Sequence, residues 1–195
     1  ASALLDVLTG KVNPSGKLAE TWPIRYEDNP SCKHFGGPGR TVEYREGIYV
    51  GYRYYQTADV QVSYPFGYGL SYTTFSYSDL DAAPEEVSLT VTNTGSCDGD
   101  EIVQVYIAKP DASVFRPDEE LKGFARVHLA AGESRRVTIP LGYKAFRYWN
   151  SMAWNWAVEG GDYQVRVGAS CTDIRLTASV EVTSTQAPDP YGKLV

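Results

Sequence analysis

The sequence predicts a mainly β protein, in which an antiparallel β-sandwich follows the end and connector of another domain. From Thr74 to about Thr183, short alternating apolar segments are separated by turn residues, with no helical pattern between them. That arrangement is typical of a β-sandwich. Ahead of it, one short helical pattern is followed by turns and loops. We therefore expect a connector over residues 1–72, a sandwich over 73–183, and a linker or tail over 184–195.

The N-terminal segment has the pattern of the last turns of a helix that belongs to a larger domain. Residues 3–8 are apolar at helical spacing, and Gly10 stands where a left-handed C-terminal cap is favoured. The turn sequence NPSG follows at residues 13–16, and Trp22-Pro23 indicates an extended segment. A helix this short cannot form a core alone, so we expect the rest of its domain to lie upstream in a longer chain.

The second half of the connector is rich in glycine and aromatic residues. Residues 28–41 contain Asn29-Pro30 and the sequence GGPG, which predict a loop. Residues 42–55, VEYREGIYVGYRYY, are dense in β-branched and aromatic side chains and predict one or two strands. Residues 66–75, FGYGLSYTTF, suit a backbone that turns sharply while its aromatic rings stay buried, as at a seam between two packed units.

The sandwich itself is predicted strand by strand from apolar alternation between turns. Asn93-Thr94-Gly95 and Ala131-Gly132-Glu133 mark two of these turns, and a loop with Pro110 and Pro117 marks another. The expected strands cover residues 87–91, 102–107, 121–129, 137–139, 145–149, 154–158, 163–167 and 174–182.

Composition argues against several classes of partner. The net charge of −6 is unlike the basic face of a nucleic-acid-binding protein. No apolar run approaches the roughly 20 residues that a membrane span needs. We therefore expect neither nucleic acid nor membrane as a partner.

The three cysteines, Cys32, Cys97 and Cys171, are widely scattered and lack metal-binding spacing. Three free thiols are typical of a reducing compartment such as the bacterial cytoplasm. A Cys97–Cys171 disulfide is the alternative if their loops meet. His34 and His128 lie far apart in the sequence, and neither is near a nucleophile motif. We expect no metal, no cofactor and no Ser-His-Asp site.

Three pairs of carboxylates lie close together in the sequence: Glu43 with Glu46, Glu85 with Glu86, and Glu119 with Glu120. Neighbouring side chains on an extended chain point apart or to solvent, and a catalytic acid needs a buried site to shift its pKa. We therefore expect these pairs to be solvated, and Glu46 and Arg53 to pair with charges inside the connector. No catalytic residue is assigned to this chain.

The candidates for substrate binding are three tryptophans, Trp149, Trp154 and Trp156. Flat aromatic rings can stack on the apolar faces of pyranose sugars. The competing interpretation is packing in the core or between domains, because alternate positions of a strand point inward.

Ordered sequence blocks along nearly the whole chain resemble one family, glycoside hydrolase family 3, which includes β-glucosidases and β-xylosidases. The blocks are VNPSGKL at 12–18, EGIYVGYRYY at 46–55, PFGYGLSYT at 65–73, VTNTG at 91–95, GDEIVQVY at 99–106, ELKGF at 120–124, AGES at 131–134 and GDY at 161–163.

The resemblance implies a division of labour. In this family a barrel supplies the aspartate nucleophile, an α/β sandwich domain supplies the acid/base glutamate, and a fibronectin type III-like sandwich follows. By that likeness residues 1–72 are the end of the α/β sandwich domain with its connector, and residues 73–183 are the fibronectin type III-like (immunoglobulin-like) sandwich. No motif here resembles the surroundings of either catalytic carboxylate.

The resemblance thus implies an accessory, scaffold-stabilising part of a retaining exo-β-glycosidase, with β-glucosidase favoured and β-xylosidase left open. Its expected partners are the missing barrel and α/β sandwich portions of the same enzyme, which would act on β-linked oligosaccharides or glycosides. Two alternatives from other classes stay open. They are a non-catalytic carbohydrate-binding module and a purely structural or interaction sandwich.

Overall fold

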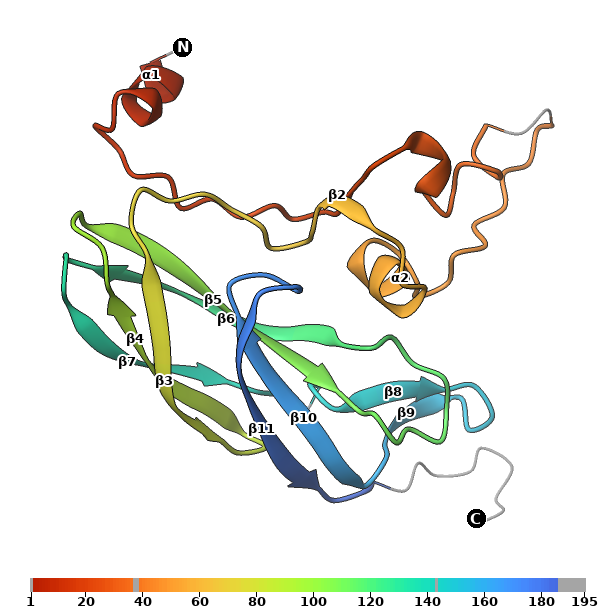
Figure 1. Ribbon diagram of the computed structural model, residues 1–195. Coiled ribbons are helices and arrows are strands. Elements are labelled where there is room, and N and C mark those ends of the chain that lie inside the picture. Colours follow the sequence, from red (N-terminus) through yellow and green to blue (C-terminus); the bar gives the residue numbers. More distant parts are fainter. Residues whose placement is uncertain (1, 37–38, 143, 186–195) are drawn as a thin grey trace.

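The computed structural model describes residues 2–36, 39–142 and 144–185, and its main body is a β-sandwich of two antiparallel sheets (Figure 1). Most of the predicted linker or tail, residues 186–195, lies outside the described residues. One sheet has the order β3 (Phe75–Ala82), β4 (Glu86–Asn93) and β7 (Ser134–Pro140). The other has the order β11 (Ile174–Val182), β10 (Gly161–Gly168), β5 (Gly99–Ala108) and β6 (Glu120–Leu129).

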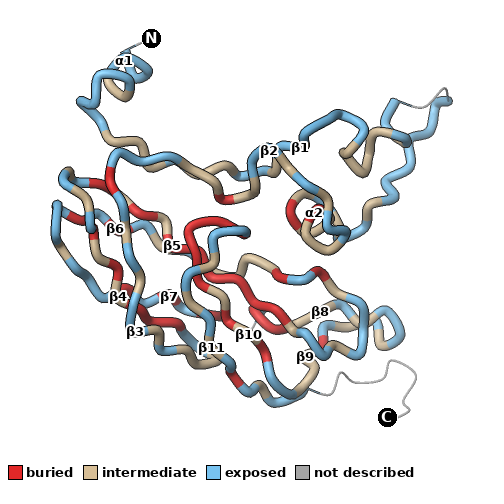
Figure 2. Tube along the Cα trace, viewed as in Figure 1, coloured by how far each residue is buried: buried red, intermediate tan, exposed pale blue. Residues whose placement is uncertain are grey.

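The core lies between the two sheets and follows the predicted period of two. Val87, Leu89 and Val91 of β4 are fully buried and face Val103 and Val105 of β5, which are also fully buried. Figure 2 shows this buried layer running along the inner strands. Burial of one such side chain contributes about 1.5–3 kcal/mol, so the alternating apolar positions are the main source of stability. The predicted sandwich is confirmed.

A buried tyrosine fixes the start of β10. The Tyr163 hydroxyl donates to the carbonyl oxygen of Glu159 at 2.8 Å, and its ring meets Phe146 edge-on at 5.1 Å. A tyrosine at this corner that bonds back to the upstream backbone is a known device of immunoglobulin-like sandwiches. It ties the incoming segment to the core.

The eight predicted strands are present, but a ninth, β3, was missed. Its sequence FSYSDLDA is polar at alternate positions and broken by a register shift between Ser78 and Asp81. Asp79 lies in this bulge with a φ of +53°. The extra residue disrupts the period of two on which strand recognition depends.

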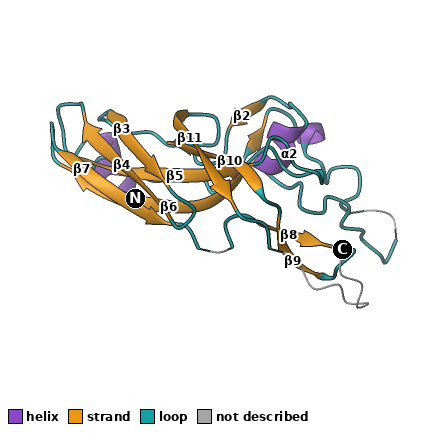
Figure 3. Cartoon of the chain, turned by 90° about the horizontal axis from the view of Figure 1, so that it is seen from below, coloured by secondary structure: helices purple, strands orange, loops and turns teal. Residues whose placement is uncertain are grey.

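Two of the predicted sandwich strands instead form a separate hairpin. Strands β8 (Arg147–Asn150) and β9 (Asn155–Val158) pair with each other and join neither main sheet, and an isolated antiparallel bridge links Val158 to Thr185. Figure 3 shows the hairpin extending from the end of the sandwich, on the side where α2 (Tyr52–Thr57) lies.

The connector runs lengthwise along the sandwich beside β5, which it contacts at Glu101, Gln104 and Tyr106 (Figure 1). It starts with α1 (Ser2–Leu8), which has no buried residue and ends before Gly10, whose φ of +73° confirms the predicted left-handed cap. A short strand, β1 (Trp22–Pro23), pairs with β2 (Val62–Tyr64), and a 3-10 helix, η1 (Tyr26–Asp28), follows β1. None of the helices in the described part of the chain is long and apolar enough to cross a membrane.

The strands predicted over residues 42–55 were wrong. Residues 42–50 form loop and turn, and the helix α2 begins after Gly51. Gly51 has a φ of +55°, which interrupts an extended chain. The helix then places Tyr52 and Tyr55 on one buried face, because residues three apart in a helix are neighbours. Burial of these rings outweighs the strand preference of the tyrosine-rich sequence.

The predicted seam is the contact between the connector and the sandwich, and residues 66–75 are part of it. Two glycines there allow the backbone to lie close to neighbouring residues. A Cβ on Gly67, whose φ is +81°, would lie 2.1 Å from Oε1 of Gln104. A Cβ on Gly69 would lie 2.4 Å from the carbonyl oxygen of Gly16. Not all of the seam is buried, however: Leu70 is 68% exposed and Tyr72 is 53% exposed.

Candidate functional site

The structure brings the three candidate tryptophans together on the β8–β9 hairpin. Trp149 and Trp156 are directly opposed across the strands, with ring centroids 5.5 Å apart. Trp154 stands in the turn with a φ of +47°, and its ring lies 6.0 Å from Trp149. The three side chains are between 45% and 69% exposed. Packing in the sandwich core is therefore wrong for all three, whereas packing between domains stays a competing prediction.

Trp149 and Trp156 of this cluster line one wall of a groove, which we call the hairpin groove. Its volume is about 610 Å³. Residues 147–152 and Trp156 of the hairpin form this wall, the β5–β6 loop at Phe115, Arg116 and Pro117 forms another, and Ile48 and Arg53 of the connector close it. Phe115 is 81% exposed and stacks on Tyr49 with ring centroids 5.3 Å apart.

Charged side chains surround these rings. Arg53 and Lys122 both pair with Glu120, at 2.9 and 3.1 Å. The Arg53–Glu120 pair joins the connector to the sandwich, so the expectation that Arg53 would pair inside the connector was wrong. The Arg116 guanidinium lies 4.4 Å from the centroid of the Tyr148 ring, and that of Arg147 lies 4.0 Å from the centroid of Trp156.

Glu159 holds Arg116 in place beside the groove. Its carboxylate accepts from the Ser113 amide at 2.8 Å and from Arg116 at 2.7 Å. Burial acts to raise the pKa of Glu159, but the hydrogen bonds from Ser113 and the Arg116 charge together outweigh it and hold the pKa below its usual range. The β5–β6 loop is thereby fastened to the segment that precedes β10.

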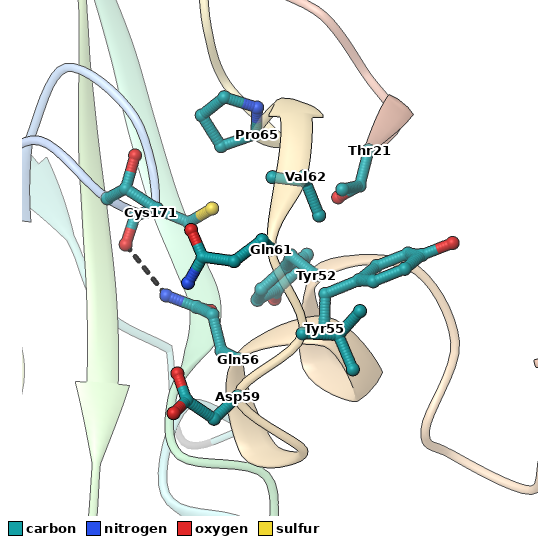
Figure 4. Close-up of a pocket in the computed structure, with 11 residues that line it drawn as sticks. Thr21, Tyr52, Tyr55, Gln56, Asp59, Gln61, Val62, Pro65 and Cys171 are labelled. Carbon is teal, nitrogen blue, oxygen red and sulfur yellow. Dashed lines mark hydrogen bonds between the residues drawn. The ribbon is translucent and has the colours of Figure 1, made fainter. Parts of the chain in front are cut away.

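A second, smaller cavity of about 290 Å³ lies at the seam between α2 and the β10–β11 loop (Figure 4). Gln56 points from α2 toward that loop, where its Nε2 donates to the Cys171 carbonyl oxygen at 2.8 Å. Tyr52 stacks on Phe66 at 4.7 Å, and its hydroxyl oxygen accepts from the Leu121 amide at 2.8 Å. These contacts use the polar groups of the seam to hold α2 on the sandwich.

Glu119 belongs to the same seam, which corrects its assignment as a solvated carboxylate. It is 1% exposed and accepts from Arg166 at 3.1 Å and from Gln56 at 3.1 Å. Burial raises the pKa of Glu119 above its usual value, and the bonds from Gln56 and Arg166 reduce the shift without cancelling it. A carboxylate enclosed in this way links α2 to β10 and is closed to a sugar.

The other carboxylate candidates are exposed or paired at the surface. Glu43 pairs with Arg45, and Glu85, in the turn before β4, and Glu86, the first residue of β4, are exposed, as expected. Glu46 is half-buried in the loop before α2. These environments offer none of the desolvation that a catalytic acid needs.

The remaining reactive groups are also in structural settings. Cys32, Cys97 and Cys171 are free thiols, so the alternative Cys97–Cys171 disulfide is not formed. Burial raises the pKa of the Cys171 thiol to about 12, so this thiol stays protonated and unreactive at neutral pH. His128 is exposed and lies 2.9 Å from Asp100. Among the described residues, no group of three or more histidine, cysteine or acidic side chains is placed to hold a metal ion.

Sequence reasoning found the tryptophans but missed the rest of the groove. Arg53, Phe115 and Arg116 lie in or beside loops, and their contacts join segments that are far apart in the sequence. The one available signal was Phe115-Arg116-Pro117, an aromatic and a cationic residue inside a proline-bearing loop.

Comparisons with known proteins agree with this architecture. Residues 1–72 match the glycosyl hydrolase family 3 C-terminal domain, and residues 101–171 match a fibronectin type III-like domain. Thermostable beta-glucosidase B of Acetivibrio thermocellus is 48% identical over 191 residues, which cover 94% of this chain and 25% of that protein. An exo-alpha-(1->6)-L-arabinopyranosidase of Bifidobacterium breve is 48% identical over 183 residues, which cover 91% of this chain and 24% of that protein.

Solved structures give the same result. The family 3 beta-glucosidase of Bifidobacterium adolescentis superposes with a TM-score of 0.90 at 47% identity, covering 95% of this chain and 28% of that one. Beta-glucosidase 3B of Thermotoga neapolitana, solved with alpha-D-glucose, gives a TM-score of 0.88 at 44% identity over 93% of this chain and 26% of that one. The chain spans about a quarter of the length of the curated relatives it matches. It therefore belongs to glycoside hydrolase family 3, of which it carries the C-terminal region with the fibronectin type III-like sandwich.

Proposed function

We propose that this chain is the accessory, C-terminal segment of a retaining exo-acting β-glycosidase, most simply a β-glucosidase. The observation that carries the proposal is the 48% identity to a beta-glucosidase of which the chain covers 25%. The remaining three quarters of such a protein have room for the catalytic domains. Its substrates would be β-linked oligosaccharides and glycosides.

The carboxylates of this chain support an accessory role. Retaining hydrolysis needs two carboxyl groups about 5–5.5 Å apart on either side of one glycosidic bond. Glu119 is enclosed by Arg166 and Gln56, and Glu120 is shared by Arg53 and Lys122. These side chains are held in ion pairs that stabilise the seam, which favours catalysis by residues outside this chain.

The connector supports the same role through its outward face. Polar groups fasten it to the sandwich, for example Lys17 to Glu101 at 3.3 Å and Asn13 to the Asp98 carbonyl oxygen at 2.9 Å. Its large apolar side chains face away: Phe35 is 74% exposed and Tyr44 is 91% exposed. We assign this face to contact with the barrel and α/β sandwich portions of the same enzyme. We place the domain division at residues 72 and 73, because Thr73 begins the contacts with β4 through Asn93.

The test compares the complete protein with the 195-residue chain on an aryl β-glucoside. The complete protein should release the phenol and, by NMR, give the β-anomer of glucose as the first product. The chain alone should not exceed background, because losing the acid or the nucleophile removes orders of magnitude in rate. Turnover by the purified chain that is lost on Glu43→Gln or Glu46→Gln would overturn the accessory assignment.

A second candidate specificity is exo-α-L-arabinopyranosidase, because two relatives at 48% and 46% identity carry that name. The complete protein assayed on aryl β-D-glucoside and aryl α-L-arabinopyranoside separates the two by the ratio of kcat/KM. A higher kcat/KM on the arabinopyranoside would favour the second specificity and leave the accessory role of this chain unchanged.

A further inference from the structure

We propose that the outer edge of β9 is a strand-docking site and that its occupant is the next stretch of this chain, residues 186–188. These three residues lie outside the described part of the chain, whereas the edge that would receive them is described in full. The added strand would turn the β8–β9 hairpin into a three-stranded sheet. This inference goes beyond the proposed function, because it concerns how the chain holds its exposed tryptophans and has no part in hydrolysis.

The β8–β9 hairpin has little support of its own. Each strand is four residues long, and neither strand joins a main sheet. Ala157 is the only buried residue in the two strands. A two-stranded hairpin is at best marginally stable in water, and a third strand is one of the ways to stabilise it. We therefore expect the hairpin to have a further partner.

The bridge between Val158 and Thr185 shows where a third strand would start. The Thr185 amide donates to the Val158 carbonyl oxygen at 3.1 Å, and the Val158 amide donates to Thr185 Oγ1 at 3.0 Å. The pairing is antiparallel, so each residue after Thr185 would lie beside an earlier residue of β9. Ala187 would then oppose Trp156, and Pro188 would oppose the first residue of β9.

The backbone of Trp156 faces the same edge. Val158 turns its N–H and C=O groups toward Thr185, and residues two apart in an antiparallel strand turn these groups to the same side. The amide of Trp156 donates at 2.8 Å to Oδ1 of Asn155, a side chain of its own strand. It is therefore not used in pairing with β8, and the carbonyl oxygen of Ala187 can take the place of that side-chain acceptor.

The sequence after Thr185 fits this edge position by position. In the paired register the amide of Ala187 points toward Trp156, whereas Gln186 and Pro188 point their backbone nitrogens away from β9. Proline has no N–H group, so it is tolerated on the outer side of an edge strand. The methyl group of Ala187 also leaves room for the Arg147 guanidinium, which lies 4.0 Å from the centroid of the Trp156 ring.

A strand placed in this way would close the edge to other chains. Unpaired edges are templates for pairing between molecules, and proline on an edge is one of the devices that prevent it. Pro188 would lie on the new outer edge. The ladder would end there, because Trp154, which precedes β9, has a φ of +47° and leaves the extended conformation.

Nuclear magnetic resonance of the 195-residue chain tests the pairing one amide at a time. We expect a nuclear Overhauser contact between the amide protons of Trp156 and Ala187, and one between the α protons of Asn155 and Pro188, because these pairs would face each other across the ladder. After correction for intrinsic rates, the Ala187 amide should exchange about tenfold more slowly than the Gln186 amide, since only Ala187 would donate to β9.

Two proline variants separate the inward amide from the outward one. Ala187→Pro removes the donor to Trp156 and should abolish the contact between Asn155 and Pro188. The matched control Gln186→Pro removes an amide that points away and should keep this contact. Exchange of the β4 amides, far from the hairpin, should be the same in both variants and shows that the sandwich stays folded.

Three results would overturn the proposal. Equal exchange of Gln186 and Ala187 at their intrinsic rates, without either contact, would show that residues 186–188 do not pair with β9. Equal loss in the two proline variants would remove the alternation. Contacts between labelled and unlabelled copies in a mixed sample would make a second copy the occupant. Activity of the complete protein on an aryl β-glucoside tests the proposed function separately and leaves these contacts unchanged.

Discussion

Glu119 and Glu120 are neighbours in the sequence with opposite environments. Glu119 is enclosed between α2 and β10, whereas the Glu120 side chain is 25% exposed at the edge of the hairpin groove. Adjacent residues of an extended chain point to opposite sides, and here one side is the seam and the other the surface. The residue type alone gives no sign of this difference, which is why both were expected in solvent.

Replacing Glu119 should therefore cost far more stability than replacing its neighbour. Glu119→Ala removes the buried acceptor shared by Arg166 and Gln56, which keep only Gln164 and the Cys171 carbonyl as acceptors, at a cost of about 2–3 kcal/mol in the free energy of unfolding. Glu120→Ala should cost about 1 kcal/mol or less, because its pairs are at the surface. Urea denaturation of the two variants measures both values. Equal losses would show that Glu119 does not hold the seam.

Glu159 should give the protein an acid-sensitive contact. Its pKa is lowered in the folded state, so its contribution is fully present above the unfolded pKa of about 4.5 and is lost as the pH falls through the folded pKa. Glu159→Gln should destabilise the protein by about 1–2 kcal/mol at pH 6, and this difference should shrink on acidification.

The measurement is thermal unfolding of wild type and Glu159→Gln between pH 2 and pH 6. The control is Glu85→Gln, since Glu85 is exposed in the turn before β4. A difference in stability between wild type and Glu159→Gln that grows as the pH falls would contradict the lowered pKa of Glu159.

At the scale of elements, the sequence pattern predicted the strands that bury one face. It did not predict the elements whose conformation depends on tertiary contacts. Val87, Leu89 and Val91 alternate cleanly and gave β4. The bulge at Asp79 hid β3. Tyrosine-rich α2 was read as strand, because its helical form depends on a surface that the sandwich provides through Tyr106. The candidate site follows the same rule: its tryptophans lie close in sequence, whereas Arg53 and Phe115 reach the same groove only through the tertiary fold.

Helix α2 should behave as a unit that opens separately from the sandwich. Tyr52→Ala removes a ring that contacts Phe66 and Tyr106 and should destabilise α2 by about 3 kcal/mol. Amide exchange in Tyr52–Thr57 should then be about a hundredfold faster, with β4 and β5 unchanged. Tyr44→Ala, at a residue that is 91% exposed, is the control. Equal acceleration in β5 would show that helix and sandwich unfold together.

The whole molecule combines a sandwich with a complete core and a connector whose apolar side chains face outward. The core between the two sheets is made by sandwich residues alone, with Tyr163 closing its corner, whereas Tyr106 on the outer side is covered by Tyr52 and Phe66 of the connector. The connector has only two buried hydrophobic side chains among its described residues, Tyr52 and Tyr55, both on α2. Its stability should therefore depend on contacts that this chain does not supply.

Hydrogen exchange of the 195-residue chain tests that dependence. Amides of residues 2–36 and 39–51 should exchange within minutes, whereas those of β4, β5 and β10 should be protected to near the global free energy of unfolding. In the complete protein the connector should become protected as well. Equal protection of connector and sandwich in the isolated, monomeric chain would contradict this account.

The pairing of β1 with β2 also bears on how such a protein can evolve. Trp22 and Tyr64 are partners in this short ladder, so the residues between β1 and β2 start and end at the same place. The entropy of closing a loop grows only with the logarithm of its length, so adding residues between fixed ends costs little. Residues 24–50 can therefore gain or lose segments in different lineages while α2, β2 and the sandwich keep their positions. A domain inserted into this segment would be held at both ends by the β1–β2 pair.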